Sequence, residues 1–77
     1  MTIDGSVVSV DLPKSQIVVK SSDLMTFFLP PDAKIINDDG FDMQLSSVHA
    51  GDYVTVDYHD DQSGSHIMEF MEVEYNR

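Results

Sequence analysis

The chain has 77 residues, of which 42% are hydrophobic, and a formal net charge of −10. This length allows one domain with a single core, and the hydrophobic fraction excludes intrinsic disorder. The absence of cysteine excludes disulfides and thiolate metal sites. We therefore expect residues 1–77 to form one domain, a monomer that packing alone stabilises.

The sequence has no segment that would place it in a membrane. Its uncharged runs are far shorter than the roughly 20 apolar residues of a membrane-spanning helix. The N-terminus has no basic region followed by an apolar one, which a signal peptide would require. We expect a soluble protein, cytoplasmic as given, or exported if a signal peptide has been removed.

The acidic residues gather in the later part of the chain. Residues 1–31 contain three acids and two lysines, a net charge of −1, whereas residues 32–77 contain eleven acids, one lysine and one arginine, a net charge of −9. A field of one sign repels phosphate groups, which nucleic-acid binding must neutralise with cations. We expect no nucleic-acid partner; the partner is an unknown protein or small ligand.

A first strand is predicted over residues 3–11, where Val8 and Val10 share one face. Val7 can also face the core only if the strand contains a β-bulge near Val8 and Ser9. Such bulges allow a strand to bend around a small barrel.

A proline-containing turn at 12–15 and a second strand at 16–20 predict a hairpin. The third strand, at 24–29, carries bulky side chains on both faces. Leu24 and Phe28 therefore lie either under the following loop, which we favour, or in an exposed apolar patch that would be an interaction site.

Prolines stop the third strand, and residues 33–36 can form only a short strand. Residues 37–40 predict a turn in which Gly40 adopts a positive φ. Apolar and polar residues alternate weakly over 41–45, with Phe41, Met43 and Leu45 on one side.

The clearest local signal precedes the fifth strand. Ser46 is predicted to cap a short helical turn over 47–50, and Gly51 to end it in the left-handed region. A strand then alternates from residue 53 onward. Its buried face is predicted to hold Val54, Val56 and Tyr58.

The final strand is predicted at 66–75, after a polar loop. Its core side consists either of Met68 and Phe70 or of Ile67, Met71, Val73 and Tyr75. A second bulge would reconcile the two sets.

About six short strands with turns between them predict an all-β fold, a small antiparallel OB-like β-barrel with one short helical turn before Gly51-Asp52. Closure is favoured because an open sheet would leave two edges exposed. The predicted inward residues are Val10, Ile17, Val19, Phe27, Val54, Val56 and Val73.

Two motifs carry a resemblance over most of the chain: Gly5-x-Val7-x-x-Val10-Asp11 and Leu45-x-x-Val48-x-x-Gly51-Asp52-x-Val54-x-Val56-x-Tyr58. The sequence resembles small bacterial domains of unknown function that form OB-like barrels, often in exported or envelope proteins. The resemblance implies a fold and no established activity, catalytic residue or cofactor.

Two histidines offer a candidate metal site. His59 and His66 flank the loop 60–65, so a hairpin could bring them across from one another with Asp61 nearby. Two imidazoles and a carboxylate can bind zinc, copper or nickel. The alternative, two surface histidines beside an acidic loop, is the one we favour.

A second acidic segment, 37–42, has four oxygen-bearing side chains but lacks the spacing of a calcium loop. No pair of carboxylates is singled out for hydrolysis, and we expect no enzyme activity and no cofactor. The sequence therefore predicts a non-catalytic binding or protein-interaction module, with a divalent-metal-binding domain using His59 and His66 or the acidic loops as the alternative.

Overall fold

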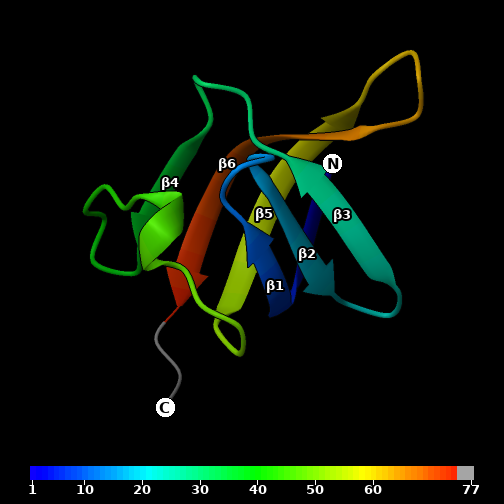
Figure 1. Ribbon diagram of the computed structural model, residues 1–77. Coiled ribbons are helices and arrows are strands. Elements are labelled where there is room, and N and C mark those ends of the chain that lie inside the picture. Colours follow the sequence, from blue (N-terminus) through cyan, green and yellow to red (C-terminus); the bar gives the residue numbers. More distant parts are fainter. Residues whose placement is uncertain (75–77) are drawn as a thin grey trace.

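The computed structural model describes residues 1–74, which form a small closed β-barrel (Figure 1). The sheet order is β3-β2-β1-β5-β6-β4, and a further pairing of β3 with β6 closes it. The strands are β1 (Thr2–Asp11), β2 (Gln16–Lys20), β3 (Leu24–Phe28), β4 (Lys34–Asn37), β5 (Tyr53–Asp60) and β6 (His66–Glu74). One 3₁₀ turn, η1 (Leu45–Ser47), precedes β5. The predicted all-β, OB-like barrel with one short helical turn is confirmed, and its strands are antiparallel as predicted except where β6 pairs with β3 and β4.

Barrel closure depends on a short parallel contact. β3 pairs with β6 only at Phe27 with His66 and at Phe28 with Ile67. Beyond that point β4 runs parallel to the rest of β6, starting where Lys34 pairs with Phe70. β6 therefore has β5 on one side and β3 followed by β4 on the other.

The predicted bulge in β1 is present. Val7 pairs with Val19, but the next pair joins Ser9 to Val18, so Val8 has no partner on β2. The bulge turns Val7 into the core, where it is 3% exposed, and leaves Val8 44% exposed.

A second bulge reconciles the two candidate faces of β6. The β5–β6 register shifts between Asp57 and Tyr58, which leaves Glu69 as the extra residue. The inward residues of β6 are Met68, Met71 and Val73. Tyr75, which the sequence placed on this strand, lies outside the described residues.

The core fills the barrel with apolar side chains from every strand. Its buried members are Val7, Ile17, Val19, Phe27, Leu29, Ile35, Val48, Val54, Val56, Tyr58, Met68, Met71 and Val73. Val10, also predicted inward, is only partly buried and packs against this cluster near the end of β1.

The turn before β5 differs from its prediction. The Ser47 N–H donates to the Gln44 carbonyl at 2.9 Å, so the turn begins before Ser46 and no side chain caps it. Of the donors that a Ser46 cap would have served, the Val48 N–H donates to the Leu45 carbonyl and the His49 N–H donates to Asp52 Oδ2. Gly51 has a φ of 96°, as predicted for the residue that ends the turn.

The segment after β4 does not form the weakly alternating strand that the sequence indicated. Phe41 is 70% exposed, because the Asn37 side chain binds the Phe41 N–H and turns this residue outward. Asp42 makes an isolated bridge to Ile36, and the Met43 N–H donates to the Ile35 carbonyl at 2.8 Å. Residues 41–43 thus cover the outer edge of β4. Within residues 1–74 no helix is long and apolar enough to cross a membrane.

Candidate functional site

The two candidate ligand histidines lie on opposite faces of the β5–β6 hairpin. The register pairs His66 with Asp60 and His59 with Ile67. Because neighbouring residues on a strand point to opposite faces, His59 faces outward and His66 faces the barrel interior. The expectation that the rings lie across from one another is wrong, since the hairpin register is offset by one residue.

His59 makes an exposed side-chain contact with Glu69. Its Nδ1 atom lies 2.5 Å from Glu69 Oε2, and the two side chains are 53% and 57% exposed. Exposed pairs of this kind contribute little to stability. His59 therefore resembles the surface histidine of the favoured interpretation.

His66 has a more enclosed position at the seam between β3 and β6. Its Nδ1 atom donates a hydrogen bond to Asp60 Oδ1 at 2.5 Å, and its side chain is 31% exposed. Its ring centroid lies 5.4 Å from that of Tyr58 and 5.8 Å from that of Phe27. The carboxylate and the two aromatic rings fix the orientation of the imidazole.

His66 lines a surface cavity of about 350 Å³ beside β3. Met25, Thr26 and Ser65 also line this cavity. Met25 is partly buried and packs against the core. Met25 and His66 therefore border the same cavity.

Asp61, the third residue of the predicted metal site, is engaged within its own loop. Its Oδ1 atom accepts hydrogen bonds from the Ser63 hydroxyl at 2.7 Å and from the Ser65 N–H at 2.9 Å. These bonds lower the pKa of Asp61 below its ordinary value. The carboxylate organises the β5–β6 loop.

Clusters of hard ligands are missing from the described chain. Among residues 1–74, no three His, Asp or Glu side chains group closely enough to hold a metal ion. In the acidic segment 37–42, Asn37 Oδ1 accepts from the N–H groups of Asp39 and Phe41. Asp42 is 81% exposed and lies 3.7 Å from the Lys34 ammonium. This segment is a hydrogen-bonded turn.

The proposed interaction residues are exposed. Leu24 is 64% exposed and Phe28 is 40% exposed, so the favoured burial under the following loop is wrong. The loop runs elsewhere because Leu29 turns into the core and its N–H donates to the Ser15 carbonyl at 2.8 Å. Whether a partner binds Leu24 and Phe28 stays a prediction.

Met25 is the residue of this site that sequence reasoning missed. The sequence predicted a third strand with bulky side chains on both faces, and nothing in its pattern marked Met25 as a ligand. The parallel pairing of Phe27 with His66 brings β6 to the edge of β3, and no local pattern signals that contact.

Comparisons with known proteins identify the fold. No family model matches the chain, and no curated protein matches it in sequence. The structure is similar to CusF with silver(I) bound, with a TM-score of 0.70, 18% identity and 95% of each chain covered.

Two structures of CusF from Escherichia coli give the same result. The copper(II) form of a tryptophan-to-alanine variant has a TM-score of 0.72 and 18% identity, over 97% of this chain and 91% of that one. The apo form has a TM-score of 0.72 and 17% identity, over 97% and 87%. At these identities the likeness shows a shared small OB-like barrel.

Proposed function

We propose that this protein is a non-catalytic binding module whose ligand is a soft metal ion, copper(I) or silver(I), held by His66 and Met25. The observation that carries the proposal is the position of His66. Asp60 orients its ring, and Met25 lines the same cavity.

The hydrogen bond to Asp60 selects the ligand atom. A carboxylate that accepts the Nδ1 hydrogen leaves the Nε2 lone pair of a neutral imidazole available for a metal ion. Within residues 1–74 the only hydrogen bond of the His66 ring is the one to Asp60. His66 therefore combines a fixed ring with an available nitrogen.

The donor types decide which ion fits. Thioether sulfur is a soft ligand that favours copper(I), and imidazole also suits copper. Zinc and calcium sites are built from clusters of several nitrogen, thiolate or carboxylate ligands, and the described chain offers no group of three. The cavity therefore fits a soft ion better than the divalent ions considered from the sequence.

The fold likeness gives the proposal independent support. The similar CusF structures include one with silver(I) and one with copper(II). A barrel of this shape therefore accommodates these ions, although the ligand residues suggested here are argued from this chain alone.

A silver titration followed by NMR tests the proposal. Equimolar silver(I) should shift the Met25 methyl and His66 ring signals in a saturable way. Met25→Leu and His66→Phe keep the bulk of each side chain and should weaken binding about tenfold or more. The matched controls are Met43→Leu and His59→Ala, which should bind silver as the parent protein does. Unchanged affinity in Met25→Leu, or equal shifts at His59 and His66, would contradict the proposal.

A further inference from the structure

Half of β3 is a free sheet edge. β3 pairs with β2 along its whole length but with β6 only at Phe27 and Phe28. The Leu29 N–H donates toward β2, to the Ser15 carbonyl, and backbone groups alternate in direction along a strand. The N–H of Thr26 and both backbone groups of Leu24 therefore point away from β2. Among residues 1–74 no strand pairs with them there.

The outer edge of β4, by contrast, is covered by a neighbouring segment of the chain. Residues 41–43 cover β4 through the bridge from Asp42 to Ile36 and the bond from the Met43 N–H to the Ile35 carbonyl. Uncovered edges are templates for pairing with another chain. Beside the free part of β3 lies the cavity of about 350 Å³, and no described segment fills it.

The outward residues of β2 and β3 next to this edge are mostly uncharged. Cross-strand pairs place six outward residues on β2 and β3: Gln16, Val18, Lys20, Leu24, Thr26 and Phe28. These six residues include one lysine and no carboxylate, and acids border them at Asp11, which pairs with Gln16, and at Asp23, which precedes Leu24. Leu24 and Phe28 add exposed apolar surface at 64% and 40% exposure.

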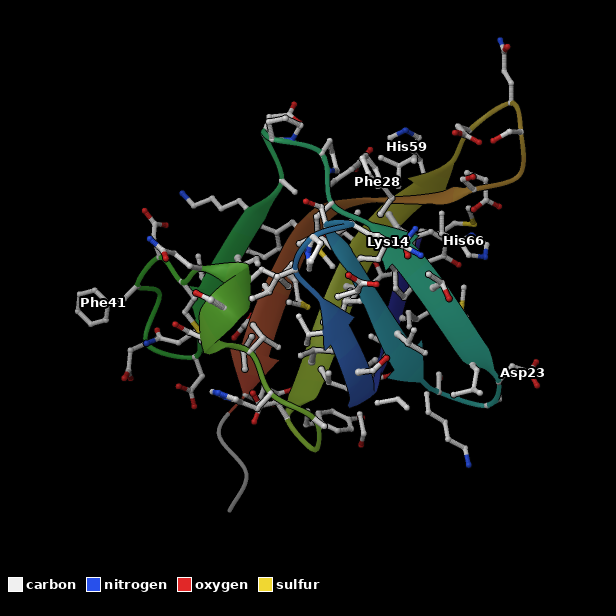
Figure 2. All side chains as sticks on the ribbon, viewed as in Figure 1. Lys14, Asp23, Phe28, Phe41, His59 and His66 are labelled. Atoms are coloured by element: carbon white, nitrogen blue, oxygen red, sulfur yellow. The ribbon has the colours of Figure 1, made fainter. Side chains whose placement is uncertain are left out.

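We infer that the free edge of β3 binds an extended segment of a basic partner protein, which adds to the sheet as a strand. Backbone bonds to Leu24 and Thr26 would supply affinity, and contacts with Leu24 and Phe28 would select apolar side chains at alternate positions. Figure 2 shows Asp23 at the turn end of β3, and Phe28 and His66 toward the other end. A basic residue at the end of the segment can meet Asp23.

The net charge argues against a second copy of this chain as the occupant, because two protomers of charge −10 repel each other. The same charge attracts a basic partner and speeds its encounter. The inference does not depend on the proposed metal site, since it uses neither the His66 nitrogen nor the Met25 sulfur.

A synthetic peptide, Lys-Lys-Val-Thr-Val-Thr-Val-Lys-Lys, tests the inference on the metal-free protein in the presence of a chelator. Binding should shift the amide signals of residues 24–28 and 64–66 and slow hydrogen exchange at the Thr26 N–H about tenfold or more. A peptide of the same charge with proline as its central residue lacks one backbone donor and should bind about tenfold more weakly.

Protein variants separate edge pairing from general attraction. Leu24→Lys changes an exposed side chain and should weaken the peptide about tenfold, whereas Leu12→Lys, at a turn residue that is 51% exposed, should not. The inference would be overturned if both peptides bound equally and salt abolished their binding. It would also be overturned if the amide signals did not shift, or if only those of β5 and β6 shifted. Pairing of two protomers through β3 would overturn it in favour of a second copy.

Discussion

Gly5 in β1 lies so close to Lys20 in β2 that a Cβ atom on Gly5 would stand 2.2 Å from the Lys20 carbonyl oxygen. Gly5 pairs with Val54 and Lys20 pairs with Ser6, so neither backbone can move aside without breaking the register of the barrel. We expect Gly5→Ala to lower the free energy of unfolding by about 2 kcal/mol or more. Urea denaturation measures this loss. The neighbouring exposed change Ser6→Ala should stay within about 0.5 kcal/mol, and an equal midpoint for both variants would contradict the argument.

Val56→Asp should prevent folding. Val56 is completely buried on the inner face of β5, and an unpaired carboxylate there costs several kcal/mol in a domain whose stability is about 5 kcal/mol. Val8→Asp is the matched control, because the bulge leaves Val8 44% exposed. Circular dichroism during thermal unfolding should show a folded control and an unfolded Val56→Asp. A near-native melting curve for Val56→Asp would rule out the inward position of this residue.

The β5–β6 loop should lose stability in acid through Asp61. The Ser63 hydroxyl and the Ser65 N–H lower the pKa of Asp61 from the ordinary value of 3.8. Because the pKa of Asp61 is lower in the folded protein, its carboxylate contributes its full stabilisation at pH values above the ordinary pKa. This stabilisation is lost as the pH falls through the pKa of the folded protein. Ser63→Ala should therefore raise the pKa of Asp61, which carbon NMR of its carboxyl group measures. Ser22→Ala, in the turn between β2 and β3, should leave that pKa unchanged.

Asp60 should act as a positioning residue for the proposed metal ligand. Asp60→Asn keeps an oxygen near the His66 Nδ1 atom but removes its charge, and we expect silver(I) affinity to fall about tenfold. Nitrogen NMR should also show a smaller fraction of the His66 ring in the Nδ1-protonated tautomer. A purely structural role of Asp60 would not change this fraction. Glu69→Gln makes the same change beside His59 and should leave silver binding intact. An unaltered affinity in Asp60→Asn would remove Asp60 from the site.

Single-stranded DNA should not bind at physiological salt. Each phosphate contact needs a cation, and the outward face of β2 and β3 offers only Lys20. Fluorescence anisotropy with a labelled thymidine oligonucleotide should show no binding at micromolar protein. Measurable micromolar affinity would contradict the charge argument.

Much of the barrel could be predicted because the information is local. The alternation of Val54, Val56 and Tyr58 identified the inward face of β5, and Gly51 identified the end of the turn before it. Both bulges followed from apolar residues that a regular strand would have placed on opposite faces, as with Val7 and Val10.

The candidate site was harder to predict because it depends on register and on contacts distant in sequence. A shift of one residue in a hairpin moves a side chain to the other face, which is why His59 and His66 were wrongly placed across from each other. The predicted Ser46 cap is absent because a 3₁₀ backbone bond and the Asp52 carboxylate accept from the N–H groups that it would have served. Only the fold of the whole chain places Met25 and His66 beside one cavity.

The parallel seam between β3 and β6 also has a consequence for the order in which the protein folds. It joins β3 and β6 through only two residue pairs, whereas β1 and β5 are joined through five. Both pairings join segments distant in sequence, so loop-closure entropy is lost before any contact compensates for it, and the β3–β6 seam offers fewer contacts in return. The two hairpin-linked units, β1 to β3 and β5 with β6, should therefore form first and join through β1 and β5. The pairing of Phe27 with His66 is then the last to form and the first to open during unfolding.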